Sequence, residues 1–165
     1  MKTTIRVLAV VLFVSALATV PVLWWIERLY DIPENYAEVE AGLWMGGDTQ
    51  QPPPGTIAVL NLCEFDDPYR TEIYLWESIR DAKPAPSIDW LKKKVDWVES
   101  HHGAGKTTYV HCFAGRSRSG LVVTAYLMHK HGWSRDEAMA NVREKRPEIR
   151  VNATFMELLN EWEKR

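Results

Sequence analysis

Short apolar runs separated by turn-forming residues predict the strands of this chain. Four runs of five to eight residues, bounded by turn-forming or charged positions, have the length and composition expected of buried strands. They cover residues 39–45, 56–63, 72–79 and 107–111. Clustered prolines mark two intervening segments, 50–55 and 80–87, as loops.

Apolar positions at helical spacing predict the helices. One apolar face recurs every three to four residues over 88–98 and again over 155–162. Residues 120–131 are apolar nearly all round, which predicts a central buried helix. Ser134 and Glu137 form a capping box, which predicts a helix start there. Strands that alternate with helices in this way predict an α/β domain.

The start of the chain has a different pattern. Residues 7–26 carry no charge, and a helix of 20 residues would cover roughly 30 Å, the thickness of the hydrocarbon core. The segment 1–26 is therefore predicted to be a transmembrane anchor, that is, an N-terminal hydrophobic helix. A cleaved signal peptide is the alternative, since residues 16–18 have the small side chains of a cleavage site; a buried core helix is a third possibility. Lys2 and Arg6 before the run favour a domain on the outer side of the membrane.

Charge and cysteine content exclude several classes of protein. Residues 27–38 indicate a linker and residues 39–165 a single domain. The chain of 165 residues has a formal net charge of −2, and an acidic domain is unsuited to non-specific binding of nucleic acid. The two cysteines, Cys63 and Cys112, can form neither a disulfide framework nor a four-thiolate zinc site.

One segment carries recognisable chemistry. Residues 111–119 read His-Cys-Phe-Ala-Gly-Arg-Ser-Arg-Ser between a predicted strand and a predicted helix. In that position the backbone N–H groups and the positive end of the helix dipole form a cradle for an anion. Arg118 adds a planar fork for two phosphate oxygens, and the same groups should stabilise the thiolate of Cys112, a nucleophile aimed at phosphorus. The predicted phosphate-binding residues are Phe113, Ala114, Gly115, Arg116, Ser117 and Arg118.

This loop resembles the Cys-x5-Arg loop of the cysteine-dependent protein tyrosine phosphatase superfamily, in the form His-Cys-x-x-Gly-x-x-Arg-Ser starting at His111. Residues 125–128, Arg146-Pro147 and residues 152–155 look like the dual-specificity branch, and the resemblance covers roughly residues 40–164. It implies a central mixed β-sheet flanked by helices on both faces. It also implies hydrolysis in two steps without a metal or another cofactor.

The resemblance implies a role for each residue of the site. Cys112 attacks phosphorus while Asp81 protonates the leaving oxygen, and Asp81 then activates the water that releases phosphate. Arg118 and the N–H groups of the loop stabilise the charge of the transition state. Ser119 hydrogen-bonds the departing thiolate, and His111 orients the loop.

Several positions near the site leave alternatives open. Asp66 and Asp67 are alternative acids, although they follow an earlier strand. Asn152 is expected to brace the loop, to cap the last helix, or to do both. Arg116 either recognises a second acidic group or is simply solvated. By likeness to some lipid-directed relatives, Cys63 is hypothesised to form a reversible disulfide with the nucleophile on oxidation; its alternative is a small buried hydrophobic residue.

The sequence therefore predicts a phosphoric monoester hydrolase that forms a phosphocysteine intermediate, first of all a dual-specificity protein phosphatase at a membrane. A phosphatase of membrane phospholipids (phosphoinositide or phosphatidylglycerophosphate) is the alternative, because residues 115–119 also resemble such enzymes. Phe113 argues against it, since a lysine is common at that place in phosphoinositide-directed loops. An inactive phosphate-binding module is the alternative of another class. The expected partner is a phosphoprotein or phospholipid substrate, with no nucleic acid.

Overall fold

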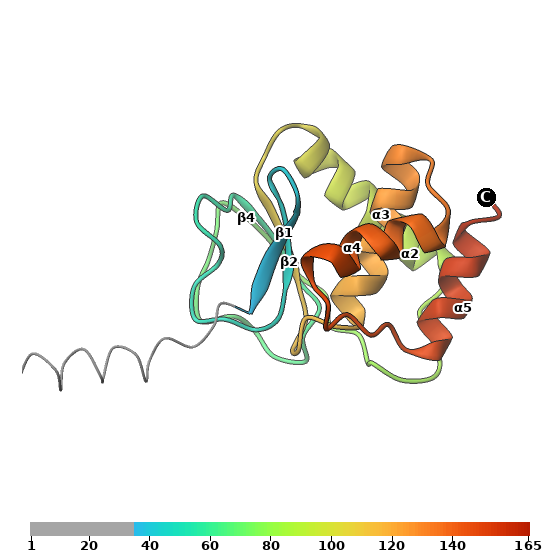
Figure 1. Cartoon of the computed structure of the whole chain (residues 1–165). Helices are drawn as coiled ribbons and strands as arrows, with labels where there is room; N and C mark the ends of the chain where they lie inside the picture. Colours follow the sequence, from blue (N-terminus) through green and yellow to red (C-terminus); the bar gives the residue numbers. More distant parts are fainter. Residues whose placement is uncertain (1–34) are drawn as a thin grey trace, which may run out of the picture. The chain divides into compact units, whose positions relative to one another are not determined.

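A five-stranded mixed sheet organises the domain in the computed structural model, which describes residues 35–165 (Figure 1). The strand order is β1-β2-β5-β3-β4; β1 is antiparallel to β2, and the other neighbours are parallel. The carboxyl ends of β2, β3, β4 and β5 therefore lie at one edge of the sheet. The strands are β1 (Tyr36–Glu40), β2 (Leu43–Gly46), β3 (Ala58–Asn61), β4 (Ile73–Trp76) and β5 (Thr108–His111).

The predicted strands are all present, but the first of them is a hairpin. Residues 39–45 were expected to form one strand, whereas β1 and β2 are joined by a tight turn in which Gly42 has φ +76°. The amide of Gly42 donates to the Glu38 carboxylate over 2.8 Å, which closes the turn. The apolar pattern alone hides this reversal, because both strands bury side chains in the same core. β1 begins at Tyr36, inside the segment 27–38 that the sequence indicates as a linker.

The predicted helices are all present, and one predicted cap can be checked directly. The Ser134–Glu137 capping box is present at the start of α4, and α3 ends at Gly132 with φ +67°. The prediction of a central buried helix is confirmed, because every residue of α3 from Arg118 to Met128 is buried. The helices are α2 (Ile88–Val98), the π-helical turn η1 (Glu99–Gly103), α3 (Arg118–His131), α4 (Arg135–Lys145) and α5 (Ala153–Trp162).

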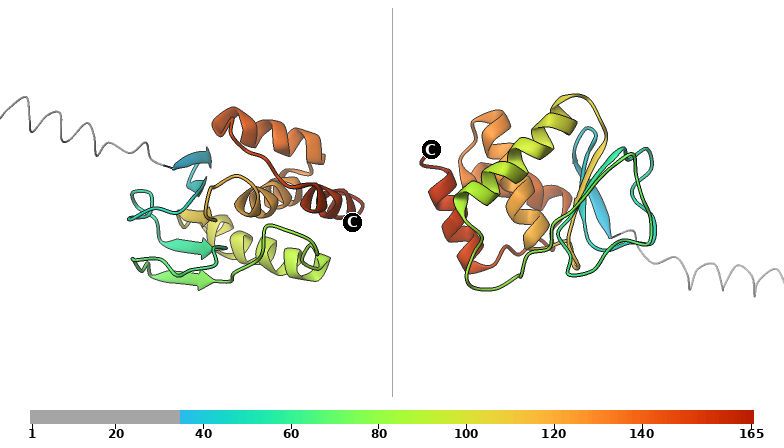
Figure 2. Two further views of the ribbon diagram at one scale, coloured as in Figure 1. Left: turned by 90° about the horizontal axis from the view of Figure 1, so that it is seen from below. Right: turned by 180° about the vertical axis from the view of Figure 1, so that it is seen from behind.

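The four α-helices of the described residues all lie on one face of the sheet (Figure 2). The expectation of helices on both faces is therefore wrong for residues 35–165. Across the sheet, the connections from β2 to β3 and from β3 to β4 lead toward the edge formed by β4. The connection from β4 to β5 leads in the opposite direction. Crossovers between parallel strands are right-handed, so connections that lead in opposite directions across the sheet lie on opposite faces of it. Of these three connections, only the one from β4 to β5 contains a helix. Loops and an aromatic cluster that includes Tyr69 and Tyr109 cover the other face.

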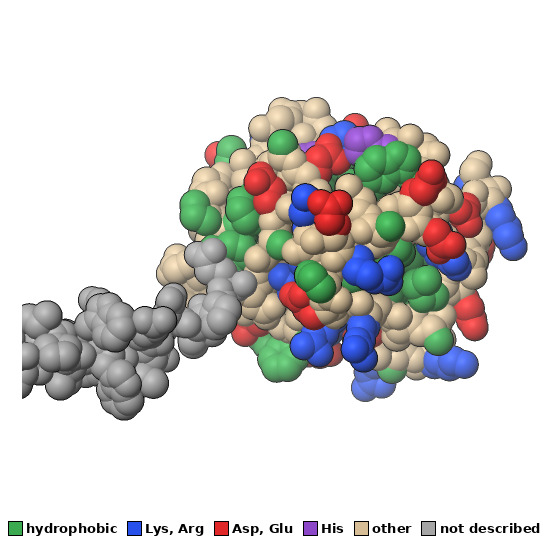
Figure 3. All heavy atoms as spheres, in the orientation of Figure 1, with side chains coloured by type: hydrophobic (Ala, Val, Ile, Leu, Met, Phe, Trp, Pro, Cys, Tyr) green, Lys and Arg blue, Asp and Glu red, His purple; other side chains and the backbone are tan. Residues whose placement is uncertain are grey.

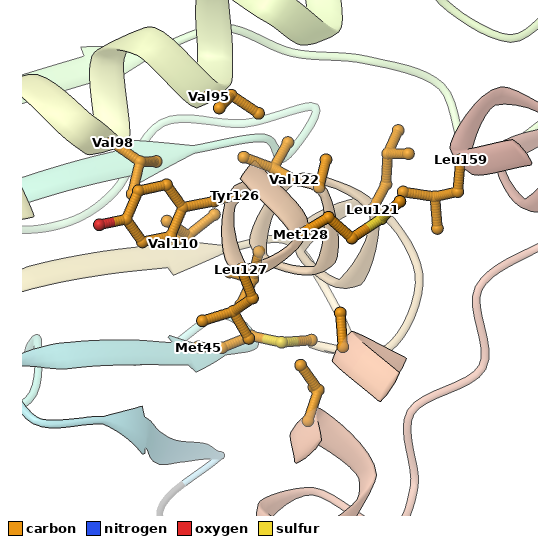
Figure 4. Close-up of a cluster of buried hydrophobic side chains, with 14 of the residues drawn as sticks. Met45, Val95, Val98, Val110, Leu121, Val122, Tyr126, Leu127, Met128 and Leu159 are labelled. Carbon is orange, nitrogen blue, oxygen red and sulfur yellow. The ribbon is translucent and has the colours of Figure 1, made fainter. Parts of the chain in front are cut away.

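The main core lies between the sheet and α3 (Figure 4). Met45 and Val110 from the strands, Val95 from α2 and Leu159 from α5 pack around α3 side chains such as Leu121. Each of these side chains is fully buried, and burial of one such side chain contributes roughly 1.5–3 kcal/mol. The core thereby holds the amino end of α3 firmly against the carboxyl edge of the sheet.

The predicted anchor or signal peptide in residues 1–26 lies outside the described residues. Among residues 35–165, no helix is both long enough and apolar enough to cross a bilayer.

Candidate active site

The segment with the predicted chemistry connects the central strand β5 to the first turn of α3. We call residues 112–118 the Cys-Arg loop. Gly46 of β2 and His111 of β5 are partners in the parallel register, and the amide of Cys112 donates to the Gly46 carbonyl over 3.2 Å. The side chain of Cys112 is 1% exposed. The cysteine therefore lies on the floor of the loop, at the end of a strand that has neighbours on both sides.

Gly115 lets the Cys-Arg loop lie directly on the backbone of β2. Its φ is +65°, and a Cβ atom there would come within 2.4 Å of the Gly46 carbonyl carbon and 2.5 Å of the Gly47 nitrogen. Both values are far below van der Waals contact, so no residue with a side chain fits without moving the backbone. The glycine predicted for this turn is required by packing as well as by its dihedral angle.

Ser119 lies in the first turn of α3, beside the predicted nucleophile. Its Oγ is 3.4 Å from Cys112 Sγ and 3.2 Å from the carbonyl oxygen of Gly46. A hydroxyl has one proton to donate, so these two atoms compete for it. This geometry allows Ser119 to donate to the sulfur when the sulfur carries charge, which is the contact implied by the resemblance.

Arg118 is held in place by three acceptors. Its Nη1 donates to Glu64 Oε2 over 2.6 Å and also lies within 3.3 Å of the carbonyl oxygens of Leu62 and Ile79. Burial opposes the charged guanidinium, but the hydrogen bond to Glu64 leaves the pKa of Arg118 raised. The same hydrogen bond lowers the pKa of Glu64. Arg118 Nε is buried and has no hydrogen-bond partner among the described residues, so this N–H donor of the guanidinium group remains free.

Asp81 accepts two hydrogen bonds, one of them from the Cys-Arg loop. Its Oδ1 accepts from Ser117 Oγ over 2.6 Å and from Asn152 Nδ2 over 2.5 Å. The amide of Asn152 donates to Ser117 Oγ over 3.1 Å, and its Oδ1 caps α5 by accepting from the Phe155 amide over 2.9 Å. Asn152 thus makes both of the predicted contacts, and it holds an exposed carboxylate beside the loop.

The two alternative acids are engaged elsewhere. Asp67 is buried, and its Oδ2 accepts from His111 Nε2 over 2.9 Å. Asp66 pairs with Arg70 and accepts from the Tyr74 hydroxyl over 2.7 Å. The Asp67 carboxylate orients the His111 ring beneath the loop, which makes it a positioning group.

The remaining residues of the loop form its rim. Phe113, Ala114 and Arg116 are exposed, whereas Ser117 is buried. The backbone of Arg116 accepts from the Arg150 amide over 3.1 Å, which ties the rim to the segment between α4 and α5. Within residues 35–165, no three His, Cys, Asp or Glu side chains gather as metal ligands would.

Comparison with known proteins identifies this arrangement. The family model "Dual specificity phosphatase, catalytic domain" matches residues 57–165, which is more than half of the chain. The chain belongs to this family. Human dual specificity protein phosphatase 16 is 35% identical over 105 residues, which are 64% of this chain and 16% of that protein. Mouse phosphatidylglycerophosphatase and protein-tyrosine phosphatase 1 is 37% identical over 84 residues, 51% of this chain and 44% of that protein.

A solved structure extends the likeness to nearly the whole phosphatase domain. The crystal structure of a mouse putative dual specificity phosphatase, complexed with zinc tungstate, superimposes with a TM-score of 0.74 and 26% identity. The match covers 81% of this chain and 89% of that one. By contrast, the chain spans less than half the length of the two curated relatives above.

Two residues that hold the Cys-Arg loop, Glu64 and Arg146, were not among the predicted site residues. Glu64 anchors Arg118, and the buried Arg146 donates from Nε to the Gly115 carbonyl over 3.2 Å. Arg146 Nη2 also donates to Asn35 Oδ1 over 3.0 Å. Arg146-Pro147 was part of the family resemblance, which was the available signal. Nothing in the local sequence shows that Glu64 faces a residue 54 positions later.

The second cysteine lies beneath the loop. Cys63 Sγ is 3.8 Å from His111 Nδ1, and both cysteines are free thiols in the structure. Burial raises the pKa of the Cys63 thiol well above its ordinary value, and the nearby Cys112 adds to this. When His111 donates Nε2–H to Asp67, its Nδ1 is left as the acceptor that faces the Cys63 thiol.

Replacing Glu64 by glutamine should weaken the hold on Arg118. The side chain keeps its length but loses the charge that pairs with the guanidinium, and misplacement of that group should lower kcat/KM for an aryl phosphate roughly 10-fold. Steady-state kinetics measures the effect, with the exposed helix residue Glu157→Gln as the matched control. An unchanged kcat/KM would show that the backbone carbonyls suffice to hold Arg118.

The Glu64–Arg118 pair should also make stability depend on pH. Because the pKa of Glu64 is lowered in the folded protein, its contribution is complete above the ordinary value of 4.5 and is lost as pH falls through the folded value. Glu64 is half exposed, so the contribution should be no more than about 1 kcal/mol. Thermal unfolding of the wild type and Glu64→Gln should differ at neutral pH and converge in acid. A constant difference would contradict this pairing.

Proposed function

We propose that this chain is a phosphoric monoester hydrolase that works through a phosphocysteine intermediate at Cys112. The observation that carries the proposal is the meeting of three groups at one sheet edge. Cys112 lies on the floor of the loop, Arg118 lies beside it with a free donor, and Asp81 is hydrogen-bonded to the loop at Ser117. A nucleophile, a charge-stabilising group and an acid are what transfer of a phosphoryl group to sulfur needs.

The reaction follows from this geometry in two steps. Cys112 thiolate forms a bond to phosphorus as the bond to the leaving oxygen breaks, and Asp81 gives its proton to that oxygen. Arg118 and the amides of the loop stabilise the negative charge on the phosphoryl oxygens. Water then attacks phosphorus with Asp81 accepting its proton, and the departing thiolate receives a hydrogen bond from Ser119, 3.4 Å away. Inorganic phosphate leaves and the enzyme returns to its starting state.

A phosphoprotein is the first proposed substrate, and a membrane phospholipid is the second. The family match and the likeness to human dual specificity protein phosphatase 16 support the first. The likeness to a mouse protein named phosphatidylglycerophosphatase and protein-tyrosine phosphatase 1 supports the second. In both substrates the loop would bind the same phosphate monoester, so only the leaving group differs.

Phosphate release by the full chain under reductant tests the proposal. An aryl phosphate should be hydrolysed, after which phosphotyrosine, phosphoserine and phosphothreonine peptides are compared with vesicles of phosphatidylglycerophosphate and phosphoinositides. A folded chain that binds phosphate but turns over none of these would be the inactive binding module. Faster turnover of vesicles than of peptides would reverse the order of the two substrates.

We further propose that residues 7–26 anchor the phosphatase to a membrane, with the domain on the outer side. Twenty residues without charge, preceded by Lys2 and Arg6, support this. Fractionation at high pH should leave the full chain with the membrane, and external protease should cleave its domain. Release of a shortened chain into the soluble fraction would indicate a cleaved signal peptide, and resistance to external protease would reverse the orientation.

We propose, finally, that oxidation of Cys112 is reversible through Cys63. Peroxide converts Cys112 thiolate to a sulfenic acid and releases hydroxide; the Cys63 thiol then forms the disulfide and releases water. His111 Nδ1, 3.8 Å from Cys63, is placed to accept the thiol proton. After peroxide treatment and then dithiothreitol, recovered activity should be at least about threefold lower in Cys63→Ser than in the wild type. Equal recovery of activity in the wild type and Cys63→Ser would contradict a disulfide between Cys63 and Cys112.

A further inference from the structure

Three aromatic side chains stand exposed at the same sheet edge as the active site. Phe65, Trp76 and Phe113 are 42%, 46% and 57% exposed, and they are the exposed large hydrophobic side chains of the described residues. Trp76 ends β4, Phe65 follows β3 and Phe113 follows Cys112, so all three belong to carboxyl ends of parallel strands. The rings of Phe65 and Phe113 meet edge to face at 5.8 Å, and the indole N–H of Trp76 donates to the Cys63 carbonyl over 3.0 Å.

Four exposed cations accompany these rings. Arg80 and Lys83 flank Asp81, Arg116 lies in the loop, and Arg150 is bonded through its amide to Arg116. Among residues 35–165, none of the four takes part in an ion pair. Along the lower edge of the domain, where Figure 1 shows the loop between β5 and α3, Figure 3 shows hydrophobic side chains next to basic ones.

Most acidic groups at this edge have partners within the domain, and three of them are paired with basic side chains. Glu64 pairs with Arg118, Asp66 with Arg70 and Glu148 with Arg146. Asp81 is hydrogen-bonded to Ser117 and Asn152. Asp48 is partly buried. The edge around the active site therefore presents unpaired positive charge, although the whole chain carries a net charge of −2.

The segment that precedes the domain enters it at this same edge, at Asn35. The carbonyl of Asn35 accepts from the Gly47 amide over 2.7 Å, and its side chain shares Arg146 with Gly115 of the Cys-Arg loop. Eight residues, 27–34, separate Asn35 from the uncharged run that ends at residue 26. Even a fully extended chain of this length reaches only about 30 Å. An anchor in residues 7–26 would therefore hold Asn35, the point where the chain enters the domain at this edge, within about that distance of a bilayer.

We propose that this edge docks on an anionic lipid surface, with Phe65, Trp76 and Phe113 in the interfacial layer and Arg80, Lys83, Arg116 and Arg150 on the headgroups. Aromatic rings favour the membrane interface, and each cation near an anionic surface adds to the attraction. The opening of the active site then faces the bilayer. This inference rests on the proposed anchor, but it does not depend on catalysis.

Fluorescence quenching by brominated lipids tests the docking. The full chain is reconstituted in brominated phosphatidylcholine vesicles with and without phosphatidylglycerol, and the wild type is compared with Trp76→Phe. The chain has eight tryptophans, so Trp76 should account for roughly one eighth of the emission, and that part should be quenched in anionic vesicles. Signals from the other tryptophans cancel in the difference.

Charge reversal then tests the cations. The triple variant Arg80→Glu, Lys83→Glu, Arg150→Glu should abolish the quenching that depends on Trp76. A matched triple variant on other parts of the domain, Lys93→Glu, Lys106→Glu, Lys164→Glu, should retain it. Circular dichroism and thermal unfolding verify that each variant is folded.

The outcomes separate docking from catalysis. Trp76 quenching without turnover of an aryl phosphate would overturn the proposed function and support the docking. Turnover without Trp76 quenching in either type of vesicle, or equal loss of quenching in both triple variants, would overturn the docking. If Trp76 is not quenched and Phe65→Gln slows turnover of a soluble phosphotyrosine peptide, the aromatic rings contact the peptide and the membrane proposal is wrong.

Discussion

Replacing Cys112 by serine is expected to abolish phosphate release from an aryl phosphate, by at least about 10⁴-fold. Serine preserves the size of the side chain and the contact with Ser119, 3.4 Å away, but its hydroxyl is not ionised near neutral pH and is a poor nucleophile. Release of nitrophenol by wild type and Cys112→Ser, assayed side by side under reductant, measures the loss.

Phosphate binding serves as the control for this variant. The amides of the loop and the guanidinium of Arg118 are unchanged in Cys112→Ser, so inorganic phosphate should still raise its unfolding temperature. A variant that binds phosphate without turning over substrate is the signature of a lost nucleophile. Residual turnover within tenfold of the wild type would mean that Cys112 is not the nucleophile.

Replacing Asp81 by asparagine should slow the enzyme by roughly 10²–10⁴-fold on substrates with poor leaving groups. Asparagine keeps an oxygen that can accept from Ser117 and Asn152, but its amide N–H groups are too weakly acidic to protonate the leaving oxygen. Aryl phosphates with acidic phenols need little protonation, so their turnover should fall far less. A series of aryl phosphates with graded leaving groups measures this dependence.

Asp89→Asn is the matched control for Asp81→Asn. Asp89 is an exposed aspartate in the first turn of α2, on the same connection between β4 and β5, and its substitution should leave turnover within about twofold. An equal loss for every leaving group in Asp81→Asn would contradict the acid role. It would instead assign Asp81 to the support of Ser117 and Asn152.

The order and type of the secondary structure followed closely from local pattern. Helices α2, α3, α4 and α5 lie where apolar spacing and the capping box predict them, because caps and amphipathic faces are properties of neighbouring residues. The hairpin at Gly42 was hidden because β1 and β2 contribute to one apolar run. The sequence pattern also did not show that the helices lie on one face of the sheet. That depends on the direction of each crossover, which is set by the strand order.

For the candidate site too, local features could be predicted from the sequence, whereas contacts between distant segments could not. The nine residues from His111 to Ser119 carry the cradle and the cysteine, because one strand–loop–helix turn positions them all. Which aspartate acts as the acid could not be read from the sequence in this way. Asp67 and Asp81 are both loop aspartates in the sequence, yet one is buried against His111 and the other is hydrogen-bonded to Ser117. Only the packing of distant segments separates these two roles.

What the amino-acid order alone established is therefore the local chemistry: the family, the loop with its nucleophile and arginine, and the succession of strands and helices. The tertiary structure decided which distant groups meet that loop, namely Glu64 at Arg118, Asp67 at His111 and Arg146 at Gly115. It also showed that exposed rings and unpaired cations share one edge with the active site. The physical reason is that hydrogen bonds and charge pairs act over a few ångströms in space, whatever the separation along the chain.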